Sequence, residues 1–344
     1  MDQGNRGSIV TPVRLGFIGI GHIAIHSHLP PIGELAKKGE VVIQAFCDVN
    51  EQSAQEQAEV YGVDNVYTDH HEMFDKEDLD GVYLCIPPTL HDDVETLCAE
   101  KGIAIFIEKP QTLDIAQAVS FSEAIEKGGI VSQVGFMSRY YASSGTVRTL
   151  LQERTPRHAQ IQLFYTGKPA RFWTSRMDLC GGTFVENTIH YVDLLRYFLG
   201  DIESVSAFYV DRKPGEGAAP MDLPHVYNVN YLFESGVTAN ATTSRVLTNV
   251  SVSRREVLVV SDDSMIVWNT SQATENEEPV GGHEEGWVAF AKQAQAFVQA
   301  IREKDPTAVK SPYVDGLNSL AAVLGANESA ANGGAVVDLK EMVS

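Results

Sequence analysis

A glutamate and a histidine lie four residues apart in the run that follows the paired glycines Gly181 and Gly182. In a helix, Glu186 and His190 would lie one turn apart on the same face, and Asp193 would fall close to that face. Most residues between them are apolar, which predicts a helix that is buried over much of its surface. Because burying a titratable group is costly unless the group is paired or used, we expect this carboxylate and this imidazole to have a chemical role.

Several roles are open from these residues alone. Glu186 could orient His190, bind a substrate hydroxyl or stabilise the start of the helix. His190 could be a general base, which suits an imidazole near neutral pH, or a hydrogen-bonded core histidine. With Asp193 the pair could also ligate a metal, but no second ligand-rich segment stands out to complete the shell. We therefore predict no metal site and expect Asp193 to be structural.

A glycine-rich turn follows the first apolar run of the chain, with the pattern G-x-G-x-x-A at Gly19, Gly21 and Ala24. In a dinucleotide-binding turn, the first glycine allows a tight turn and the second lets a pyrophosphate approach the backbone. The third small residue lets the helix pack closely on the strand, and the helix N-terminus offers free N–H groups to the phosphates. We expect His22 and Ile23, which lie inside the turn, to contact the cofactor as well.

An acidic residue supports this interpretation of the turn. Asp48 ends the next predicted strand, where a carboxylate would bind both ribose hydroxyls and repel a 2′-phosphate. The three residues that follow it include no cation that could receive such a phosphate. The turn and its acid therefore predict NAD rather than NADP.

These groups require a scaffold, and the first third of the sequence supplies one by alternating apolar strands with helical patterns. Strands are expected at 13–18, 41–47, 66–68, 81–86, 103–107 and 131–136, and helices at 51–61, 92–101 and 115–127. This alternation is typical of a parallel sheet covered on both faces, which binds ligands at the carboxyl ends of its strands. At those ends the chain places further residues that we expect to bind the cofactor: Pro87, Pro88, His91, Glu108 and Lys109.

The pattern changes after residue 136. Strands at 159–166, 204–211, 226–233, 237–244, 255–260 and 265–268 predict a mostly antiparallel sheet, and 213–223 and 272–286 are expected to be loops. Helices at about 184–199, 286–304 and 313–332 would cover one face of this sheet. Its other face would be open, which makes it a candidate surface for a homodimer or homotetramer.

The predicted fold class is therefore α/β, with an N-terminal Rossmann parallel sheet and a C-terminal α/β domain with a large, mostly antiparallel open-faced sheet. We expect a flexible tail over 1–12, a dinucleotide-binding domain over 13–136 and a domain for substrate binding and oligomerisation over 137–344.

Composition limits the other functional classes. The 344 residues carry a formal net charge of −20, which argues against nucleic acid or an anionic membrane as a partner. The four cysteines form no C-x-x-C pair, and no apolar run approaches the length of a membrane span. Sparse cysteines and a polar N-terminus without the apolar core of a signal peptide predict a cytoplasmic protein.

The chain resembles the Gfo/Idh/MocA family of NAD(P)-dependent oxidoreductases. The resemblance rests on the glycine turn, the 87–91 segment, the Glu108-Lys109-Pro110 motif and the 181–193 run, which occur in the expected order over nearly the whole chain. It implies a Rossmann domain followed by an α/β domain with a large open sheet, and activity on sugars, polyols and their derivatives. It also implies that Lys109 reaches the nicotinamide and the substrate and that His190 accepts the proton.

The chain departs from the family pattern at two positions. Glu186 stands where the family most often has aspartate, and Thr183 stands where a third glycine is more usual. Because glutamate is one methylene longer, its carboxylate must sit differently, which bears on the pose of the substrate.

Cationic and aromatic residues just before the double glycine form a further candidate group. Arg171 and Trp173, with Lys168 and Arg176, are expected either to bind the substrate, in particular an anionic one such as a sugar acid, or to form a solvated loop. Arg139 and Tyr140, just past the sixth predicted strand, are weaker candidates for the same pocket.

The resulting prediction is an NAD-dependent dehydrogenase that oxidises a secondary alcohol of a sugar, sugar acid or cyclitol. His190 would take the proton, Lys109 would assist at the reacting oxygen, and Glu186 would orient the histidine or the substrate. Two alternatives are an enzyme that retains NAD and cleaves glycosides without net oxidation, and a non-catalytic NAD-binding regulator. The regulator would need neither Lys109 nor His190.

Overall fold

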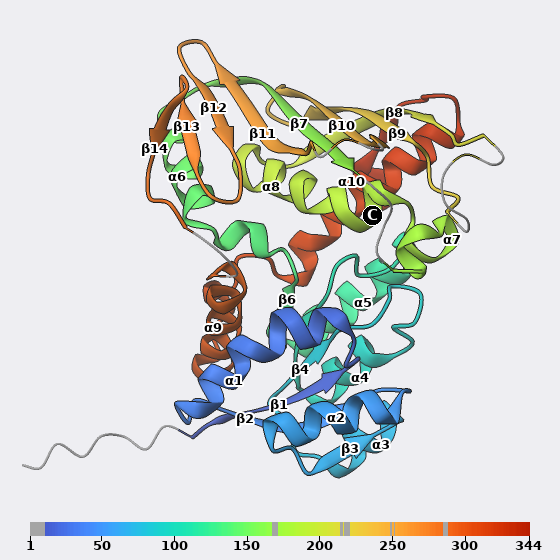
Figure 1. The fold of residues 1–344 in the computed structure, drawn as a ribbon, viewed down its shortest axis with the longest axis vertical. Helices are drawn as coiled ribbons and strands as arrows, with labels where there is room; N and C mark the ends of the chain where they lie inside the picture. Colours follow the sequence, from blue (N-terminus) through green and yellow to red (C-terminus); the bar gives the residue numbers. More distant parts are fainter. Residues whose placement is uncertain are drawn as a thin grey trace, which may run out of the picture.

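The computed structural model of the chain describes residues 11–166, 171–213, 216, 221–247, 250, 252–284 and 288–344. Two lobes are joined side by side, a smaller one built on a parallel sheet and a larger one built on a broad sheet (Figure 1). The tail expected over 1–12 falls almost entirely outside the described residues, which begin at Thr11.

The described part of the first lobe contains a six-stranded sheet in the order β3-β2-β1-β4-β5-β6, and every strand pair in it is parallel. The strands are β1 Val13–Ile18, β2 Val41–Cys47, β3 Asn65–Tyr67, β4 Gly81–Leu84, β5 Ala104–Ile107 and β6 Ser132–Val134. All residues of β4 and β5 are buried, as continuous apolar runs in a covered parallel sheet predict. The strand order reverses at β1, so a crevice is expected beyond the carboxyl ends of β1 and β4.

The helices of the first lobe are α1 Leu29–Lys37, α2 Glu51–Tyr61, α3 His70–Lys76, α4 Val94–Lys101 and α5 Ile115–Gly128. Local capping fixes several of their ends. The Asp114 carboxylate accepts hydrogen bonds from the first N–H groups of α5, and Gly129 ends that helix with a positive φ of 62°. His70 and His71 begin α3, where the Asp69 side chain accepts from the His71 N–H.

The second lobe contains a nine-stranded sheet in the order β14-β13-β12-β11-β7-β10-β9-β8-β15 within the described residues. Its longer strands are β7 Pro156–Thr166, β8 Ile202–Val210, β9 Val226–Phe233, β10 Thr238–Leu247, β11 Arg254–Ser261 and β12 Met265–Trp268. The sheet is mostly antiparallel, as predicted, but β7 and β10 pair in parallel. The shorter strands are β13 Ala273–Glu275, β14 Glu278–Val280 and β15 Val337–Asp338.

The strands β13 and β14 correct the expectation of a loop over 272–286. They form a hairpin whose two turn residues, Asn276 and Glu277, both have positive φ, 51° and 71°. Such turns usually carry glycine at the second position, so Asn-Glu gave no hairpin signal in the sequence.

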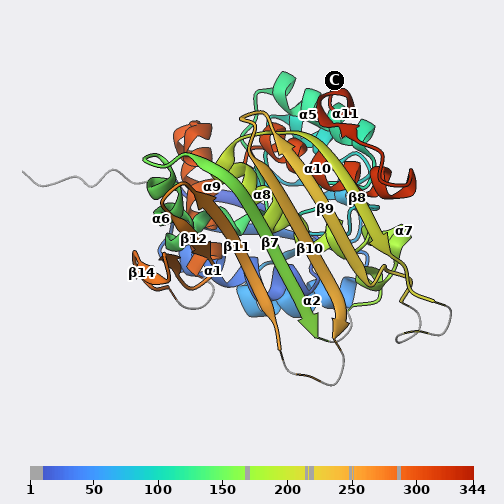
Figure 2. The same cartoon turned by 90° about the horizontal axis from the view of Figure 1, so that it is seen from above.

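One face of the second sheet is covered and the other is open (Figure 2). Burial alternates along β9, whose residues Tyr227, Val229, Tyr231 and Phe233 are buried while Asn228 and Asn230 are exposed. The covering helices are α6 Ala142–Leu151, α8 Ile189–Leu199 and α10 Tyr313–Ala331. Short elements complete the lobe: η2 Met137–Tyr140, η3 Trp173–Ser175, α7 Met177–Cys180, η5 Pro306–Ala308 and α11 Leu339–Met342.

Helix α9, Val288–Glu303, does not cover the second sheet as predicted, because it packs on the first lobe beside α1 (Figure 1). Its residues Ala294, Phe297 and Val298 are buried in the same apolar cluster as Leu15 and Phe17 of β1. The amphipathic pattern of this segment showed that it must cover an apolar surface, but could not show which sheet supplies that surface. No helix in the described parts of the chain is long and apolar enough to cross a membrane.

Candidate active site

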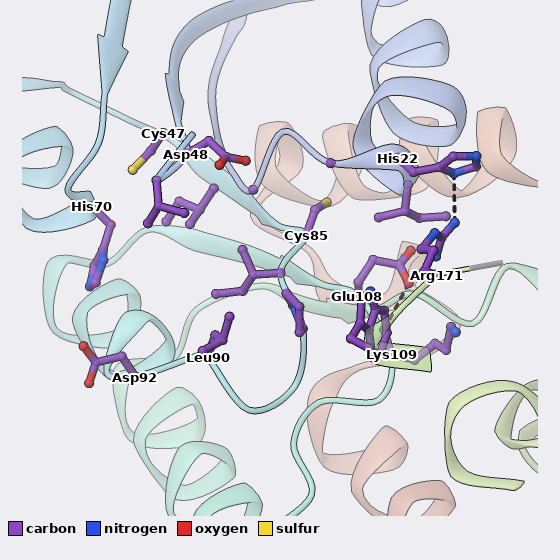
Figure 3. Close-up of a pocket in the computed structure, with 18 of the residues that line it drawn as sticks. His22, Cys47, Asp48, His70, Cys85, Leu90, Asp92, Glu108, Lys109 and Arg171 are labelled. Atoms are coloured by element: carbon purple, nitrogen blue, oxygen red, sulfur yellow. Dashed lines mark hydrogen bonds between the residues drawn. The ribbon is translucent and has the colours of Figure 1, made fainter. Parts of the chain in front are cut away.

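A cavity of about 520 Å³ opens at the carboxyl ends of the parallel strands, between the two lobes. Asp48 and His70 lie toward one end of it, and Lys109, Arg171 and His22 lie toward the other (Figure 3). Its lining includes these residues from the predicted cofactor and substrate sites: Gly19, Gly21, His22, Ile23, Asp48, Pro87, Glu108, Lys109, Arg171, Trp173 and Glu186. The structure therefore brings segments that are far apart in the sequence to one place.

The glycine turn has the geometry that a dinucleotide requires. Gly19 has a φ of 89°, and a Cβ there would lie 2.6 Å from the Cys85 carbonyl oxygen, so only glycine fits. A Cβ on Gly21 would meet nothing within 4 Å, which leaves open space beside this backbone on the cavity side. Ala24 is fully buried and begins a π-helical turn, Ala24–His28, that leads into α1. The chain thus fits a pyrophosphate at this turn, with a helix N-terminus behind it.

Asp48 is held in place by the turn itself. Its Oδ2 accepts from the Ile20 N–H at 2.6 Å, and its Oδ1 accepts from the Asn50 N–H at 2.8 Å. These bonds fix the carboxylate at the rim of the cavity, at the end of β2, where a ribose-binding acid belongs.

Lys109 links the two lobes at the other end of the cavity. It follows β5, and its Nζ donates to the Glu186 carbonyl oxygen at 2.8 Å and lies 3.6 Å from Glu186 Oε1. Both side chains are mostly buried, with 11% and 13% of their surfaces exposed. The Glu186 carboxylate therefore lies next to the Lys109 ammonium, a pairing that no local sequence pattern predicts.

The carboxylate that precedes Lys109 is fixed by a second buried contact. Glu108 Oε1 lies 2.7 Å from His28 Nε2, and both side chains are almost fully buried. A Cβ on Gly135 would lie 2.9 Å from Glu108 Oε1, so glycine leaves room for this carboxylate. His28 was not among the predicted site residues, because nothing in its sequence context showed that it would face the end of β5.

The run that carries Glu186 and His190 is helical, as predicted, but its first turn is π-helical. Phe184–Thr188 forms this turn and α8 continues from Ile189 to Leu199. Single π turns within helices occur frequently at functional sites. The relative orientation of the Glu186 and His190 side chains therefore differs from that in an ideal α-helix. Their spacing in the sequence alone could not reveal this difference.

His190 lies beside Phe136, with ring centroids 6.3 Å apart, and its Nδ1 is buried without a hydrogen-bond partner in the described structure. Burial lowers the pKa of His190 well below its ordinary value of 6.5, and the nearby Lys109 charge lowers it further. The imidazole is therefore neutral at pH 7, the state in which it can accept a proton.

Asp193 lies further along α8 and is fully buried. It accepts from Arg139 at 2.8 and 2.6 Å and from the Ser319 hydroxyl at 2.8 Å. These contacts give it the structural role that was expected for it.

Three residues predicted to bind the cofactor do not line the cavity: Ala24, which packs under the turn, Pro88 and His91. Pro88 and His91 are buried and do not border it, whereas Pro87 and Leu90 of the same segment do. His91 is 1% exposed, and its Nδ1 lies 2.7 Å from the equally buried Glu95 Oε1. The imidazole points into the protein at the start of α4, so any effect on the cofactor would be indirect.

The structure separates the cations that were grouped before the double glycine. Arg171 borders the cavity, but its Nη2 lies 2.8 Å from His22 Nδ1, above the phosphate turn. Arg176 is paired with Asp178 and Asp222. Lys168 lies outside the described residues. Of this group, Arg171 and Trp173 reach the cavity, and Arg171 lies on its cofactor side.

Arg139 and Tyr140 are not brought to the cavity. Each is 4% exposed. The Arg139 guanidinium is held by Asp193, by Asp315 at 2.6 Å and by the Lys310 carbonyl, and the Tyr140 hydroxyl accepts from Gln133 and from the Lys310 N–H. Neither side chain is available to a ligand in this arrangement, so we leave both out of the proposed site.

Other cavity residues were not anticipated. His70, Leu90 and Asp92 line the end near Asp48, where an adenosine would lie. Asp92 has a positive φ of 53°, which is uncommon for a residue other than glycine. The His-Asp-rich sequence around them gave no positional signal, because α3 and α4 meet only in the fold.

The chain matches models of known protein families in both lobes. Residues 13–136 match the oxidoreductase family with an NAD-binding Rossmann fold, and residues 152–266 match the Gfo/Idh/MocA C-terminal domain. The first lobe is thus an NAD-binding Rossmann domain.

Individual relatives point the same way. The chain is 27% identical over 197 residues to a myo-inositol 2-dehydrogenase of Thermotoga maritima, which covers 57% of this chain and 58% of the relative. It is 30% identical over 161 residues to the scyllo-inositol 2-dehydrogenase (NAD(+)) of Bacillus subtilis, which covers 44% of this chain and 45% of the relative. The matched segments thus span about half the length of these curated relatives.

The fold recurs in solved structures over nearly the full length. A levoglucosan dehydrogenase in complex with NADH and levoglucosan superposes with a TM-score of 0.84 at 18% identity, covering 95% of this chain and 99% of the other. With the two matched models, the glycine turn and the Lys109–Glu186 arrangement in place, the chain belongs to the Gfo/Idh/MocA family of oxidoreductases.

Proposed function

We propose that the protein is an NAD-dependent dehydrogenase that oxidises a secondary alcohol of a sugar, sugar acid or cyclitol. The observation that carries this proposal is the contact between Lys109 and Glu186 at one end of the cofactor cavity. Glu186 lies one turn before His190, which is neutral and whose Nδ1 has no hydrogen-bond partner among the described residues. The inositol dehydrogenases among the relatives support the class of substrate.

The residues at this contact can divide the work of alcohol oxidation. The Lys109 ammonium can donate a hydrogen bond to the reacting oxygen and stabilise negative charge that develops there. The neutral His190 can accept the hydroxyl proton. The Glu186 carboxylate beside Lys109 holds that ammonium in position and balances its charge when no substrate is present.

The cofactor supplies the hydride acceptor when it is bound, and the first lobe fits it. Gly21 leaves the backbone open to a pyrophosphate, and Asp48 is fixed where it would meet the adenosine ribose. No lysine or arginine is among the cavity-lining residues at the Asp48 end, which supports NAD over NADP.

A substrate screen tests the proposal directly. Purified protein is mixed with NAD or NADP and a panel of hexoses, uronates, aldonates and inositols, and the absorbance of NADH is followed. We expect turnover with at least one secondary alcohol and a preference for NAD. Tight NAD binding without NADH formation from any member of the panel would contradict the dehydrogenase.

The same screen separates the two alternatives. Cleavage of a glycoside by the NAD-loaded protein, without net NADH, would identify a redox-neutral enzyme that retains its cofactor. If the protein binds NAD and transforms nothing, the non-catalytic regulator is favoured instead.

We also propose that the protein forms a homodimer or homotetramer through the open face of the second sheet. Large apolar side chains lie on this face, including Phe208, 59% exposed, and Leu232, 37% exposed, among exposed asparagines. Light scattering after size-exclusion chromatography should give a multiple of 37.6 kDa, and Leu232→Arg should lower that mass. A monomer at micromolar concentration would contradict this proposal.

A further inference from the structure

Three arginines at one end of the second sheet have no carboxylate partner among the described residues. They are Arg212, just past β8, Arg245 near the end of β10 and Arg255 at the start of β11. The chain has 46 acidic and 26 basic residues, and other arginines such as Arg139, Arg196 and Arg254 do have acidic partners. Arg255 is exposed and Arg212 and Arg245 are half-buried, so all three are open to a negatively charged ligand.

Arg245 and Arg255 flank the same tyrosine. Their guanidinium carbons lie 4.7 and 5.0 Å from the ring centroid of Tyr165, a residue that is 6% exposed. The strand alternation places all three on the covered face of the sheet, because Tyr165 continues the buried series of Ile161 and Leu163. The two cations therefore face the helical side of the lobe and not the open face.

Contacts tie these arginines to the turn that carries Glu186. Arg245 Nε donates to Thr183 Oγ1 at 3.2 Å, and the Tyr165 hydroxyl donates to Asn187 Oδ1 at 2.5 Å. Thr183 and Asn187 lie on either side of Glu186 in the sequence, within or next to the π turn. Lys109 contacts Glu186, so Lys109 and Arg245 both contact the segment from Thr183 to Glu186.

Arg212 has a buried donor group at this end of the sheet, and the nearby Glu216 carboxylate acts on its charge without pairing with it. Its Nε donates to the Leu223 carbonyl at 2.8 Å, but its Nη2 is buried without a hydrogen-bond partner among the described residues. Burial lowers the pKa of Arg212, and the charge of Arg245 acts in the same direction. A buried cationic donor without an acceptor is costly, and an anion that binds here would remove that cost.

We propose that the substrate is an anion, and that its carboxylate or phosphate ester is bound by Arg245 and Arg255, with Arg212 adding to the positive field. This proposal rests on the proposed dehydrogenase function. The charged group of the substrate would be attached to a carbon other than the one that is oxidised beside Lys109 and His190. Planar guanidinium groups suit both carboxylates and phosphates, which they can bind through two parallel hydrogen bonds.

This assignment replaces the earlier grouping of cations before the double glycine. In the described structure Arg171 contacts His22 on the cofactor side and Arg176 is neutralised by two aspartates. The binding of an anionic substrate thus depends on Arg245 and Arg255, at the ends of β10 and β11, which come much later in the chain.

The test compares matched substrates and matched variants. D-Glucose, D-glucuronate and D-glucose 6-phosphate, and the galactose counterparts, are assayed for kcat/KM with NAD. We expect one charged form to exceed its neutral parent, and the identity of that form separates a carboxylate from a phosphate ester. Arg245→Gln and Arg255→Gln should each lower kcat/KM for the charged form about 10- to 100-fold, and lower it for the neutral sugar much less.

Arg254 provides the control. It adjoins Arg255 but donates to Gln162 at 2.9 Å on the opposite face and pairs with Glu256. Arg254→Gln should retain wild-type kinetics. The melting temperature in the presence of NADH and each charged sugar is a second readout that does not require turnover. The stabilisation should be present in the wild type and Arg254→Gln and absent from Arg245→Gln and Arg255→Gln.

The outcomes separate the two proposals. NADH formation from neutral sugars or inositols without preference for any charged form would overturn the anionic substrate and leave the dehydrogenase intact. Binding of a charged sugar that depends on Arg245 and Arg255, without NADH formation from any substrate, would support the anion site and overturn the dehydrogenase. Absence of both turnover and arginine-dependent stabilisation across the panel would overturn the anion site.

Discussion

The cofactor side of the cavity and its substrate side are built from different kinds of groups. The cofactor side uses backbone: Gly19 and Gly21 shape a turn, and Asp48 is fixed by the N–H groups of Ile20 and Asn50. The substrate side uses side chains from the end of β5 and from the 184–199 helix, and Arg245 of β10 contacts that helix at Thr183 from outside the cavity lining. Many different sequences with the same fold share the same backbone geometry. Side chains that converge on a site can instead be substituted one at a time without changing the fold. The first side is therefore suited to one shared cofactor, and the second can diverge toward different substrates.

The largest effects are expected where the two sides meet. Lys109→Ala and His190→Ala should each lower kcat by about 10²- to 10⁴-fold, because one removes the cation at the reacting oxygen and the other removes the proton acceptor. NAD affinity, measured by fluorescence titration, should change little. His71→Ala, which removes an exposed histidine outside the cavity lining, is the matched control and should keep normal turnover. Near-normal kcat in either alanine variant would exclude that residue from the chemistry.

The two glycines of the turn offer a sharper test of the cofactor side. Gly19→Ala places a Cβ 2.6 Å from the Cys85 carbonyl at a positive φ, so it should cost about 1–3 kcal/mol of stability from backbone strain alone and also abolish tight NAD binding. Gly21→Ala meets no protein atom, so it should leave the melting temperature unchanged and weaken NAD binding only. If Gly21→Ala bound NAD normally, the pyrophosphate would not approach this backbone.

The contrast between the two sides also explains what could be predicted from the sequence. Gly19, Gly21 and Asp48 act through local chain geometry, and the strands β1 and β2 begin and end where the apolar runs predicted. His190 was a candidate from its spacing to Glu186 and Lys109 from its place at a strand end, the resemblance implied their roles, and the structure places Lys109 against the helix of His190.

Other features depended on tertiary contacts that no local pattern encodes. Arg139 lies past a strand end, as a site residue would, but Asp193 and Asp315 from two helices bury it. Helix α9 has the amphipathic pattern of a covering helix, yet it covers the first lobe because the chain crosses back between the lobes. The π turn at Phe184–Thr188 and the pairing of Lys109 with Glu186 likewise require the assembled fold.

Asp48 should account for the next largest effect. Asp48→Ala removes the acceptor for the ribose hydroxyls and the anchor of the Ile20 N–H, so the Kd for NAD should rise about 10- to 100-fold. The Kd for NADP should change less, because the repulsion of the 2′-phosphate is lost at the same time. Titration of both cofactors measures the ratio, and an unchanged preference for NAD would show that another group selects it.

A smaller effect is expected at Arg171, the residue of the second lobe that reaches over to the phosphate turn. Arg171→Ala should raise the Kd for NAD about 3- to 10-fold by removing a cation near the pyrophosphate, while KM for the organic substrate at saturating NAD should stay unchanged. Arg176→Ala is the control, since Arg176 is neutralised by Asp178 and Asp222. A change confined to the substrate KM would place Arg171 on the substrate side after all.

The smallest effect concerns pH and tests whether the chemistry begins from a neutral imidazole. Burial and Lys109 lower the pKa of His190 well below 6.5, so the histidine stays deprotonated as the pH falls through 6.5. A solvent-exposed histidine would be about half protonated at pH 6.5, and kcat/KM would fall by about half relative to its plateau. For this protein kcat/KM should stay close to its plateau at pH 6.5 and decline only at lower pH, because protonation of His190 first becomes favourable there.

The profile is measured with a neutral substrate at saturating NAD, so that titration of a charged substrate does not contribute. An acidic limb centred at or above pH 6.5 would show that the proton acceptor is solvated in the working enzyme, or that it is a group other than His190.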